Sequence, residues 1–272
     1  MKILIVIFLI NFCYFSDLKS RNVVFQNTIK GCFCEGGIII GLVEKNDIVK
    51  IDGIQQSILD ENYFVYAFGR KYKNTVEIRV NDASKVFKVM KKKYKIERIN
   101  GLPQNKVEPN KEQIEKIVRE QSFFIQMKKN TKTKRLFKKS FTMPFNGRLT
   151  GIFGSQRILN KKPKRPHYGI DLAAKIGTKI KAPANGIVKG VYKEMFFTGN
   201  TLVIDHGLGL ISILAHMDEI FVKEGEIIDF KSILGTVGKT GRATGPHLHW
   251  GVYLEKTPID PMVLINYDFS LF

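Results

Sequence analysis

Four of the chain's five histidines lie in three short segments that are far apart in the sequence. The segments are His167-Tyr-Gly-Ile-Asp171, Leu214-Ala-His216 and His247-Leu-His249. Side chains in a strand repeat every two residues, so His247 and His249 point to one face, and His167 and Asp171 share a face in either a strand or a helix. A fold that uses these side chains together has to bring all three segments to one place.

The residue types in these segments suit zinc. Imidazole groups with one carboxylate are typical zinc donors, and catalytic zinc sites use three protein ligands and leave a fourth position for water. No cysteine lies near the segments, which argues against a closed cysteine-rich structural site. Two histidines exceed the need of such a site and are available for proton transfer and charge stabilisation, so the pattern indicates an enzyme. We expect His206, at a turn between two apolar runs, to be structural.

Seven short runs surround these histidines between about residues 141 and 265: Gly154-Ser-Gln-Arg157, Arg165-Pro-His-Tyr-Gly-Ile-Asp171, Ala182-Pro-Ala-Asn-Gly186, Val203-Ile-Asp-His206-Gly, Leu214-Ala-His216, Gly235-Thr-Val-Gly-Lys-Thr-Gly241 and Thr244-Gly-Pro-His-Leu-His-Trp250. In order and spacing, this part of the chain resembles the lysostaphin/LytM-type zinc endopeptidases of bacterial cell walls. The resemblance implies one zinc ion bound by His167, Asp171 and His249, with His216 and His247 as a catalytic pair that does not bind metal. It also implies a small antiparallel β fold with a groove, and a peptide bond of peptidoglycan as the substrate.

Three functions are compatible with this resemblance. The first is a zinc-dependent endopeptidase that hydrolyses peptide bonds of peptidoglycan stems or cross-links. The second is a non-catalytic activator of another cell-wall hydrolase, a role taken by relatives that have lost ligands, and the third is a basic surface-binding protein with a vestigial peptidase domain. The complete ligand set favours the endopeptidase. One departure from many relatives is Leu214 in place of an aromatic residue; because alternate strand positions share a face, we expect Leu214 to line the groove beside His216.

Residues 1–20 have the pattern of an export segment. A lysine follows the first methionine, residues 3–15 are almost entirely apolar, and a polar exit follows. The apolar run is shorter than the roughly 20 residues of a typical transmembrane helix, so we expect a secretory signal. No A-x-A cleavage pattern follows, which leaves an uncleaved membrane anchor as the alternative. Both predict an exported protein of the periplasm or cell envelope.

Short apolar runs separated by turn residues predict a small β-sandwich-like accessory domain over residues 23–100. Asp52-Gly53 is one of its turn signals, and the region resembles the accessory β domain that precedes the peptidase in some relatives. A binding or positioning role and a plain spacer are both open. For Cys32 and Cys34 we expect free thiols or a bridge rather than a functional site, because no histidine or further cysteine lies near them.

Residues 101–140 are predicted to be a helix and a basic linker. Asn110 can cap a helix from about 110 to 127, which has apolar residues at helical spacing. A stretch of basic residues without acidic ones follows, and we expect a solvated, mobile linker, with contact to an anionic membrane or wall surface as the alternative. The basic residues are Lys128, Lys129, Lys132, Lys134, Arg135, Lys138 and Lys139.

The predicted fold is therefore mainly β: the sandwich-like domain, the helical and basic linker, and a C-terminal antiparallel β peptidase domain over residues 141–265. The formal net charge of +19, from 44 basic and 25 acidic side chains, is consistent with an anionic partner or surface, and genome composition is the alternative source of the many lysines. Peptidoglycan, anionic wall polymers and membrane headgroups all fit this charge. We expect no nucleic-acid partner, because the chain has no recognised nucleic-acid motif and is predicted to be exported.

Overall fold

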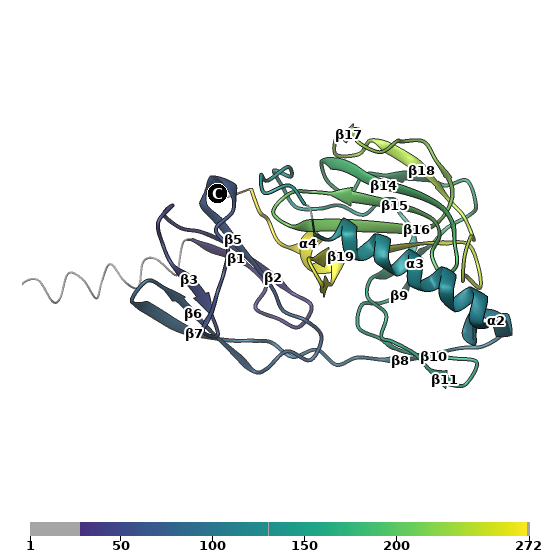
Figure 1. The fold of residues 1–272 in the computed structure, drawn as a ribbon, viewed down its shortest axis with the longest axis horizontal. Helices are drawn as coiled ribbons and strands as arrows, with labels where there is room; N and C mark the ends of the chain where they lie inside the picture. The colour runs from purple at the N-terminus through teal and green to yellow at the C-terminus, as the bar shows by residue number, and fades with distance from the viewer. Residues whose placement is uncertain (1–27, 130, 271–272) are drawn as a thin grey trace, which may run out of the picture.

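The computed structural model describes residues 28–129 and 131–270. The predicted signal or anchor in residues 1–20 lies outside these ranges, so it stays a prediction. Within the two ranges no helix has both the length and the apolar character needed to cross a membrane. The mainly β fold class is confirmed: strands dominate the described chain and almost all of them pair in antiparallel fashion (Figure 1).

The N-terminal region contains two small antiparallel sheets that share one core. Ile39 and Phe64 of the first sheet pack with Val49 and Ile78 of the second, as the alternating apolar pattern of a sandwich requires. The first sheet has the order β1 (Ile29–Gly31), β2 (Ile38–Leu42) and β5 (Tyr63–Ala67), with the short 3-10 helix η1 (Asp60–Asn62) before β5; the second has the order β4 (Ile54–Gln55), β3 (Val49–Ile51), β6 (Thr75–Val80) and β7 (Ala83–Lys88).

The turn signal at Asp52-Gly53 joins β3 to β4 as a two-residue hairpin. Ile51 pairs with Ile54 across it, and both turn residues have a positive φ, 51° and 81°. This is the conformation that a two-residue hairpin turn demands and that Asp-Gly adopts readily. The predicted sandwich-like arrangement thus follows from turn chemistry as well as from the apolar pattern.

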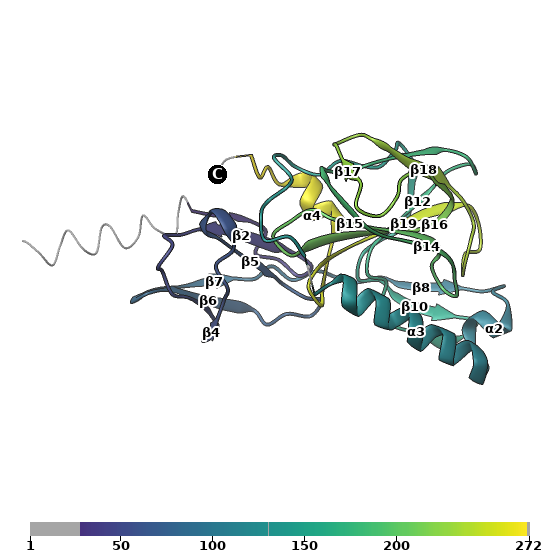
Figure 2. The same ribbon diagram turned by 45° about the horizontal axis from the view of Figure 1, so that its top comes forward.

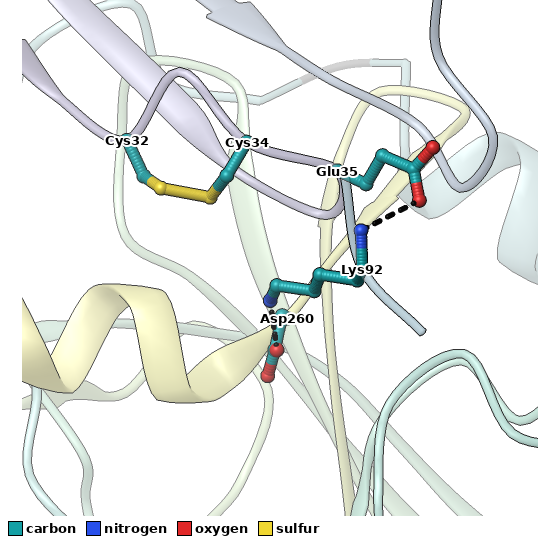
Figure 3. The surroundings of a disulfide bond; sticks show 5 residues. All are labelled: Cys32, Cys34, Glu35, Lys92 and Asp260. Carbon is teal, nitrogen blue, oxygen red and sulfur yellow. Dashed lines mark hydrogen bonds and ion pairs between the residues drawn. A yellow bond between two sulfur atoms is a disulfide. The ribbon is translucent and has the colours of Figure 1, made fainter. Parts of the chain in front are cut away.

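A disulfide joins Cys32 to Cys34 between β1 and β2, so of the two expected states the bridge is the one observed (Figure 3). Next to it, the Glu35 carboxylate accepts a hydrogen bond from the backbone N–H of Lys92 at 3.3 Å. The Lys92 ammonium lies 2.6 Å from the Asp260 carboxylate, and the Asp260 backbone N–H donates to the Gly36 carbonyl at 2.8 Å. The bridged turn therefore lies at the junction with the C-terminal region.

The predicted helix is confirmed as α3 (Lys111–Met127), preceded by the short helix α2 (Gln104–Val107). The Asn110 side chain accepts a hydrogen bond from the Gln113 backbone N–H, and the Gln113 side chain accepts one from Asn110 in return. This reciprocal cap satisfies two donors that a helix start leaves free. Figures 1 and 2 show α3 lying along one face of the large C-terminal sheet.

The basic stretch after α3 is not the freely solvated linker that we expected. Phe137 is buried in the core, and the Leu136 backbone N–H donates to the His206 carbonyl at 3.0 Å. The Lys128 ammonium lies 3.5 Å from the centre of the Tyr253 ring. The prediction gave weight to the charges and too little to the apolar residues between them, which anchor the backbone on the C-terminal sheet. Five lysines of the stretch still face solvent: Lys129, Lys132, Lys134, Lys138 and Lys139.

The C-terminal region is built on one large antiparallel sheet. Its main path has the order β17 (Ile227–Ile228), β14 (Gly186–Met195), β15 (Gly199–Asp205), β16 (Leu210–Ile220), β19 (His247–Leu254), β12 (Ile170–Ala173) and β9 (Arg148–Gly151). Three strands pair off this path: β13 (Lys179–Lys181), β18 (Ile233–Val237) and β20 (Thr257–Ile259). The helix α4 (Pro261–Asn266) follows, with Asp260 as its cap.

The two faces of this sheet are covered differently. One face carries the main core, which includes Leu202, Leu214 and Trp250. On the other face Val203 and Ile213 pack with Phe124 of α3. The sheet is therefore held between its own core and the helix that precedes it in the chain.

One strand from the first hundred residues joins the C-terminal region. Strand β8 (Ile96–Ile99) pairs in parallel with β10 (Gln156–Leu159), which also pairs with β11 (Lys162–Pro163). The register puts Glu97 opposite Arg157. The predicted domain limits of 23–100, 101–140 and 141–265 stay predictions, but β8 shows that contacts cross them.

Candidate metal centre and active site

Three of the predicted site residues meet at the edge shared by β12 and β19. Asp171 on β12 pairs directly with His249 on β19, and His167 lies in the segment that enters β12. The Asp171 Oδ1 atom lies 2.8 Å from His249 Nδ1 and 3.0 Å from His167 Nε2, and the two ring nitrogens are 2.9 Å apart. These three side chains form a group that could hold a metal ion.

The chemistry and spacing of this group fit zinc. Two imidazole nitrogens and one carboxylate oxygen are the donors of a three-ligand catalytic zinc site. A tetrahedron with bonds of about 2.0 Å has edges of about 3.3 Å, close to the three separations above. The second nitrogen of His167, Nδ1, lies 3.2 Å from the Ile152 carbonyl, which would fix the ring so that Nε2 faces the centre.

Asp171 is ionised in this environment. Burial alone would raise its pKa, but the adjacent rings of His167 and His249 outweigh burial and hold the pKa of Asp171 well below its usual range. Its second oxygen, Oδ2, accepts from the Arg157 guanidinium. Arg157 Nε in turn lies 3.5 Å from a carboxylate oxygen of Glu97 on β8. Glu97 could not be predicted from the sequence, because nothing local in the sequence marks a long-range parallel pairing.

His216 and His247 lie beside this group as a second pair, with ring centres 4.7 Å apart. His216 Nδ1 is 2.8 Å from the Thr240 carbonyl, and His247 Nδ1 is 2.8 Å from the Gly245 carbonyl. A carbonyl oxygen only accepts, so each ring carries a proton on Nδ1, and in the neutral form of the ring the free electron pair is on Nε2. Burial, and then the neighbouring histidines, lower the pKa of His216 to about 3, so this ring is neutral at pH 7.

The backbone at His216 is unusual. Its φ is +63°, a value that is uncommon outside glycine, and its backbone N–H donates to the Thr198 carbonyl at 2.8 Å. His216 interrupts the regular alternation of β16, because the register with β15 shifts between Leu214 and Met217, so Leu214 does not share a face with it. Leu214 is fully buried in the main core. Our expectation that Leu214 lines the groove was therefore wrong, because it assumed an unbroken strand up to His216.

Two glycines let the chain approach the centre closely. A Cβ atom on Gly169 would lie 2.6 Å from Cε1 of His249, and one on Gly151 would lie 2.4 Å from Oδ2 of Asp171. Neither gap can hold a side chain without moving a predicted ligand. The requirement for glycine here comes from the site and not from a turn.

A groove of about 560 Å³ opens beside the centre. Asp171 and His247 form part of its wall, and most of the rest comes from β8, β9, β10 and the loop that leads into β19. The preceding segment of the chain thus helps to shape the groove, which the sequence analysis assigned to the peptidase domain alone.

His206 lies outside this arrangement and is fully buried. One ring nitrogen is 2.8 Å from the Asn185 carbonyl and the other is 2.8 Å from the Ser212 hydroxyl, which also accepts from the Trp250 indole N–H. Both of its polar atoms are satisfied in the core. The expectation that His206 is structural agrees with this environment.

The part of the chain that forms this site is similar to a known protein family. The model of peptidase family M23 matches residues 165–261, the segment that contains all five site residues. The chain contains an M23 peptidase domain. Over 100 residues it is 38% identical to an uncharacterized metalloprotease of Buchnera aphidicola, covering 37% of this chain and 26% of the relative. Over 97 residues it is 38% identical to the peptidoglycan DD-endopeptidase ShyB of Vibrio cholerae, covering 36% of this chain and 22% of the relative.

The chain therefore spans about a quarter of the length of these curated relatives, and the likeness to them concerns the M23 domain. The likeness to one solved structure covers more of the chain. A crystal structure from Pseudomonas aeruginosa, provisionally described as a peptidase M23, is 26% identical with a TM-score of 0.64, covering 90% of this chain and 97% of the other. That overlap reaches well beyond the M23 domain to the preceding strands and helices.

Proposed function

We propose that the protein is a zinc-dependent endopeptidase that hydrolyses peptide bonds in the stems or cross-links of peptidoglycan. The observation that carries this proposal is the convergence of His167, Asp171 and His249 on one point beside the paired rings of His216 and His247. The M23 domain and the peptidoglycan DD-endopeptidase among the relatives support the substrate class. We assign one zinc ion to the first three residues and the proton transfers to the other two.

The proposed reaction needs a bound zinc ion and two histidines that transfer protons. When bound, zinc makes its water ligand acidic enough to be deprotonated near neutral pH and polarises the scissile carbonyl. The free Nε2 atoms of His216 and His247 can accept the water proton and return a proton to the leaving amine. The ring that has no part in a given transfer can stabilise the oxyanion by a hydrogen bond once it is protonated. The Thr240 and Gly245 carbonyls keep both rings oriented throughout.

We further propose that the protein acts in the periplasm or cell envelope, after export directed by residues 1–20. The five exposed lysines of the basic stretch support a contact with anionic membrane or wall surfaces. Such a contact should weaken as salt concentration rises, because exposed charges are screened.

Two alanine variants test the assigned roles. His249→Ala should lose zinc and activity together, because a ligand is removed. His247→Ala should keep zinc and lose most of its turnover, about 100-fold or more, because only proton transfer is affected. The measurements are zinc content by mass spectrometry of the metal and turnover of cross-linked muropeptides.

The opposite pattern, zinc lost from His247→Ala and kept by His249→Ala, would overturn the assignment. If the wild-type protein binds zinc and cleaves no muropeptide, while it stimulates another cell-wall hydrolase, the protein is an activator and the endopeptidase proposal fails.

A further inference from the structure

The groove beside the metal centre is rich in arginine. Arg98, Arg148, Arg157 and Arg242 line it, against Glu97 and Asp171 as its acidic residues. Arg157 contacts both of these carboxylates. Among the ion pairs of the described residues, none includes Arg98, Arg148 or Arg242. The wall of the groove therefore has three guanidinium groups whose charge no carboxylate within the described chain balances.

Arg242 differs from the other two because it is partly buried and held in place. It lies in the loop that leads into β19, five residues before His247. Its guanidinium carbon is 4.2 Å from the centre of the Phe197 ring, and Nη1 donates to the Lys106 carbonyl at 3.2 Å. These contacts fix the side chain without neutralising it.

The electrostatic surroundings of Arg242 are unfavourable for a cation. Burial, and then repulsion from Arg157, lower its pKa to about 10. Burial, then repulsion from Lys116 and to a smaller extent from Arg242, lower the pKa of Lys106, so a second cation lies near Arg242. A partly desolvated guanidinium without a counter-charge costs folding free energy. A ligand that brings a carboxylate would remove this cost.

We propose that Arg242, assisted by Arg148 at the exposed side of the groove, binds a carboxylate of the substrate peptide close to the scissile bond. The inference rests on the proposed peptidase function and narrows its substrate class to acidic peptides. A guanidinium presents several N–H groups in a planar fork that matches a carboxylate, so the interaction fixes orientation as well as charge. Arg242 lies in the loop that leads into β19, and His247 is the first residue of that strand. A carboxylate bound by Arg242 would therefore orient the peptide relative to the reacting atoms.

Peptides with free and amidated carboxylates test this proposal. The probes are stem-peptide dimers joined by a D,D peptide bond, compared with forms in which either the terminal carboxylate or the side-chain carboxylates are amides. Binding to the full chain is measured without metal, so that zinc does not attract the anion, and kcat/KM is measured with zinc. We expect one amidation to lower both affinity and kcat/KM by about 10- to 100-fold. Which amidation does so identifies the source of the carboxylate.

The variant Arg242→Gln should bind free and amidated peptides equally well, within about twofold. Arg242→Lys should recover part of the preference, because it restores charge without the planar fork. The exposed Arg148→Gln should reduce the preference by a smaller factor and does not threaten folding. Arg119→Gln, at an exposed position of α3 away from the groove, is the matched control and should leave the preference unchanged.

A wild-type protein that does not distinguish acids from amides would overturn the proposal, as would an Arg242→Gln variant that keeps the full preference. The binding arm separates this failure from failure of the proposed function. A protein that prefers the free acid and hydrolyses no peptide would retain the carboxylate site and lose the endopeptidase assignment.

Discussion

At the scale of single residues, the ligand and histidine pairs of the site could be predicted from side-chain type and from the two-residue periodicity of strands. His247 and His249 share a face of β19, and Asp171 lies directly opposite His249. The backbone conformation around His216 was not predictable in this way. The positive φ of His216 and the burial of Leu214 depend on a register shift of β16 against β15 between Leu214 and Met217, which a local pattern does not contain.

His206 gives a pH-dependent stability that is separate from catalysis. Burial lowers its pKa to about 4 from an ordinary value of 6.5. Between these two values the unfolded chain takes up a proton that the folded chain excludes, so folding free energy is lost as pH falls from about 6.5 to about 4. The contribution of one such group is at most about 1.4 kcal/mol per pH unit.

The variant His206→Asn checks this contribution. Asparagine keeps a donor for the Asn185 carbonyl and does not titrate, so the variant should be less stable at pH 7 and should lose less stability on acidification. Urea unfolding at several pH values between 4 and 7 measures both effects. An unchanged slope of unfolding free energy against pH would show that His206 is not the group that excludes the proton.

At the scale of elements, most strands and the main helix follow from local signals. The strands of the large sheet coincide with short apolar runs between turn residues, and α3 begins at its predicted cap, Asn110. The parallel pairing of β8 with β10 has no such signal, because it joins segments more than fifty residues apart. For the basic stretch after α3, the charges alone predicted a solvated linker. The structure shows instead that Phe137 is buried and anchors this segment.

The pairing of β8 predicts that an element outside the M23 domain supports the metal centre. Glu97 on β8 contacts Arg157, which holds the second oxygen of Asp171. Glu97→Gln should lower zinc affinity by about 10-fold, since contacts behind metal ligands commonly contribute that much. Competition with a zinc-binding dye measures the affinity directly and does not depend on turnover.

A matched control is Glu108→Gln, which removes a carboxylate from the same preceding segment. Glu108 contacts Lys162 at the surface and does not line the groove. Its variant should bind zinc as the wild type does. Equal zinc affinity in the two variants and the wild type would show that β8 shapes the groove without supporting the ligands.

At the scale of the whole molecule, the N-terminal sandwich and the M23 domain are tied together at more than one point. Lys92 contacts Asp260 beside the disulfide-bridged turn (Figure 3). Arg70 Nε also donates to the Gly154 carbonyl at 2.8 Å. Strand β8 then pairs with β10 in a small separate sheet, and α3 lies along one face of the large C-terminal sheet (Figure 2). The groove itself is lined by residues between Glu97 and His247, and the N-terminal sandwich is joined to the region that contains it, so tests of function are best made on a protein that retains all the described segments.

The most direct test of the endopeptidase assignment is mass spectrometry of purified cross-linked muropeptides incubated with residues 21–272. The account predicts conversion of cross-linked dimers to monomers with zinc, loss of conversion with a chelator, and recovery when zinc is restored. The masses of the products identify the bond that is cleaved. Dimers that remain intact with a zinc-loaded, folded protein would contradict the account.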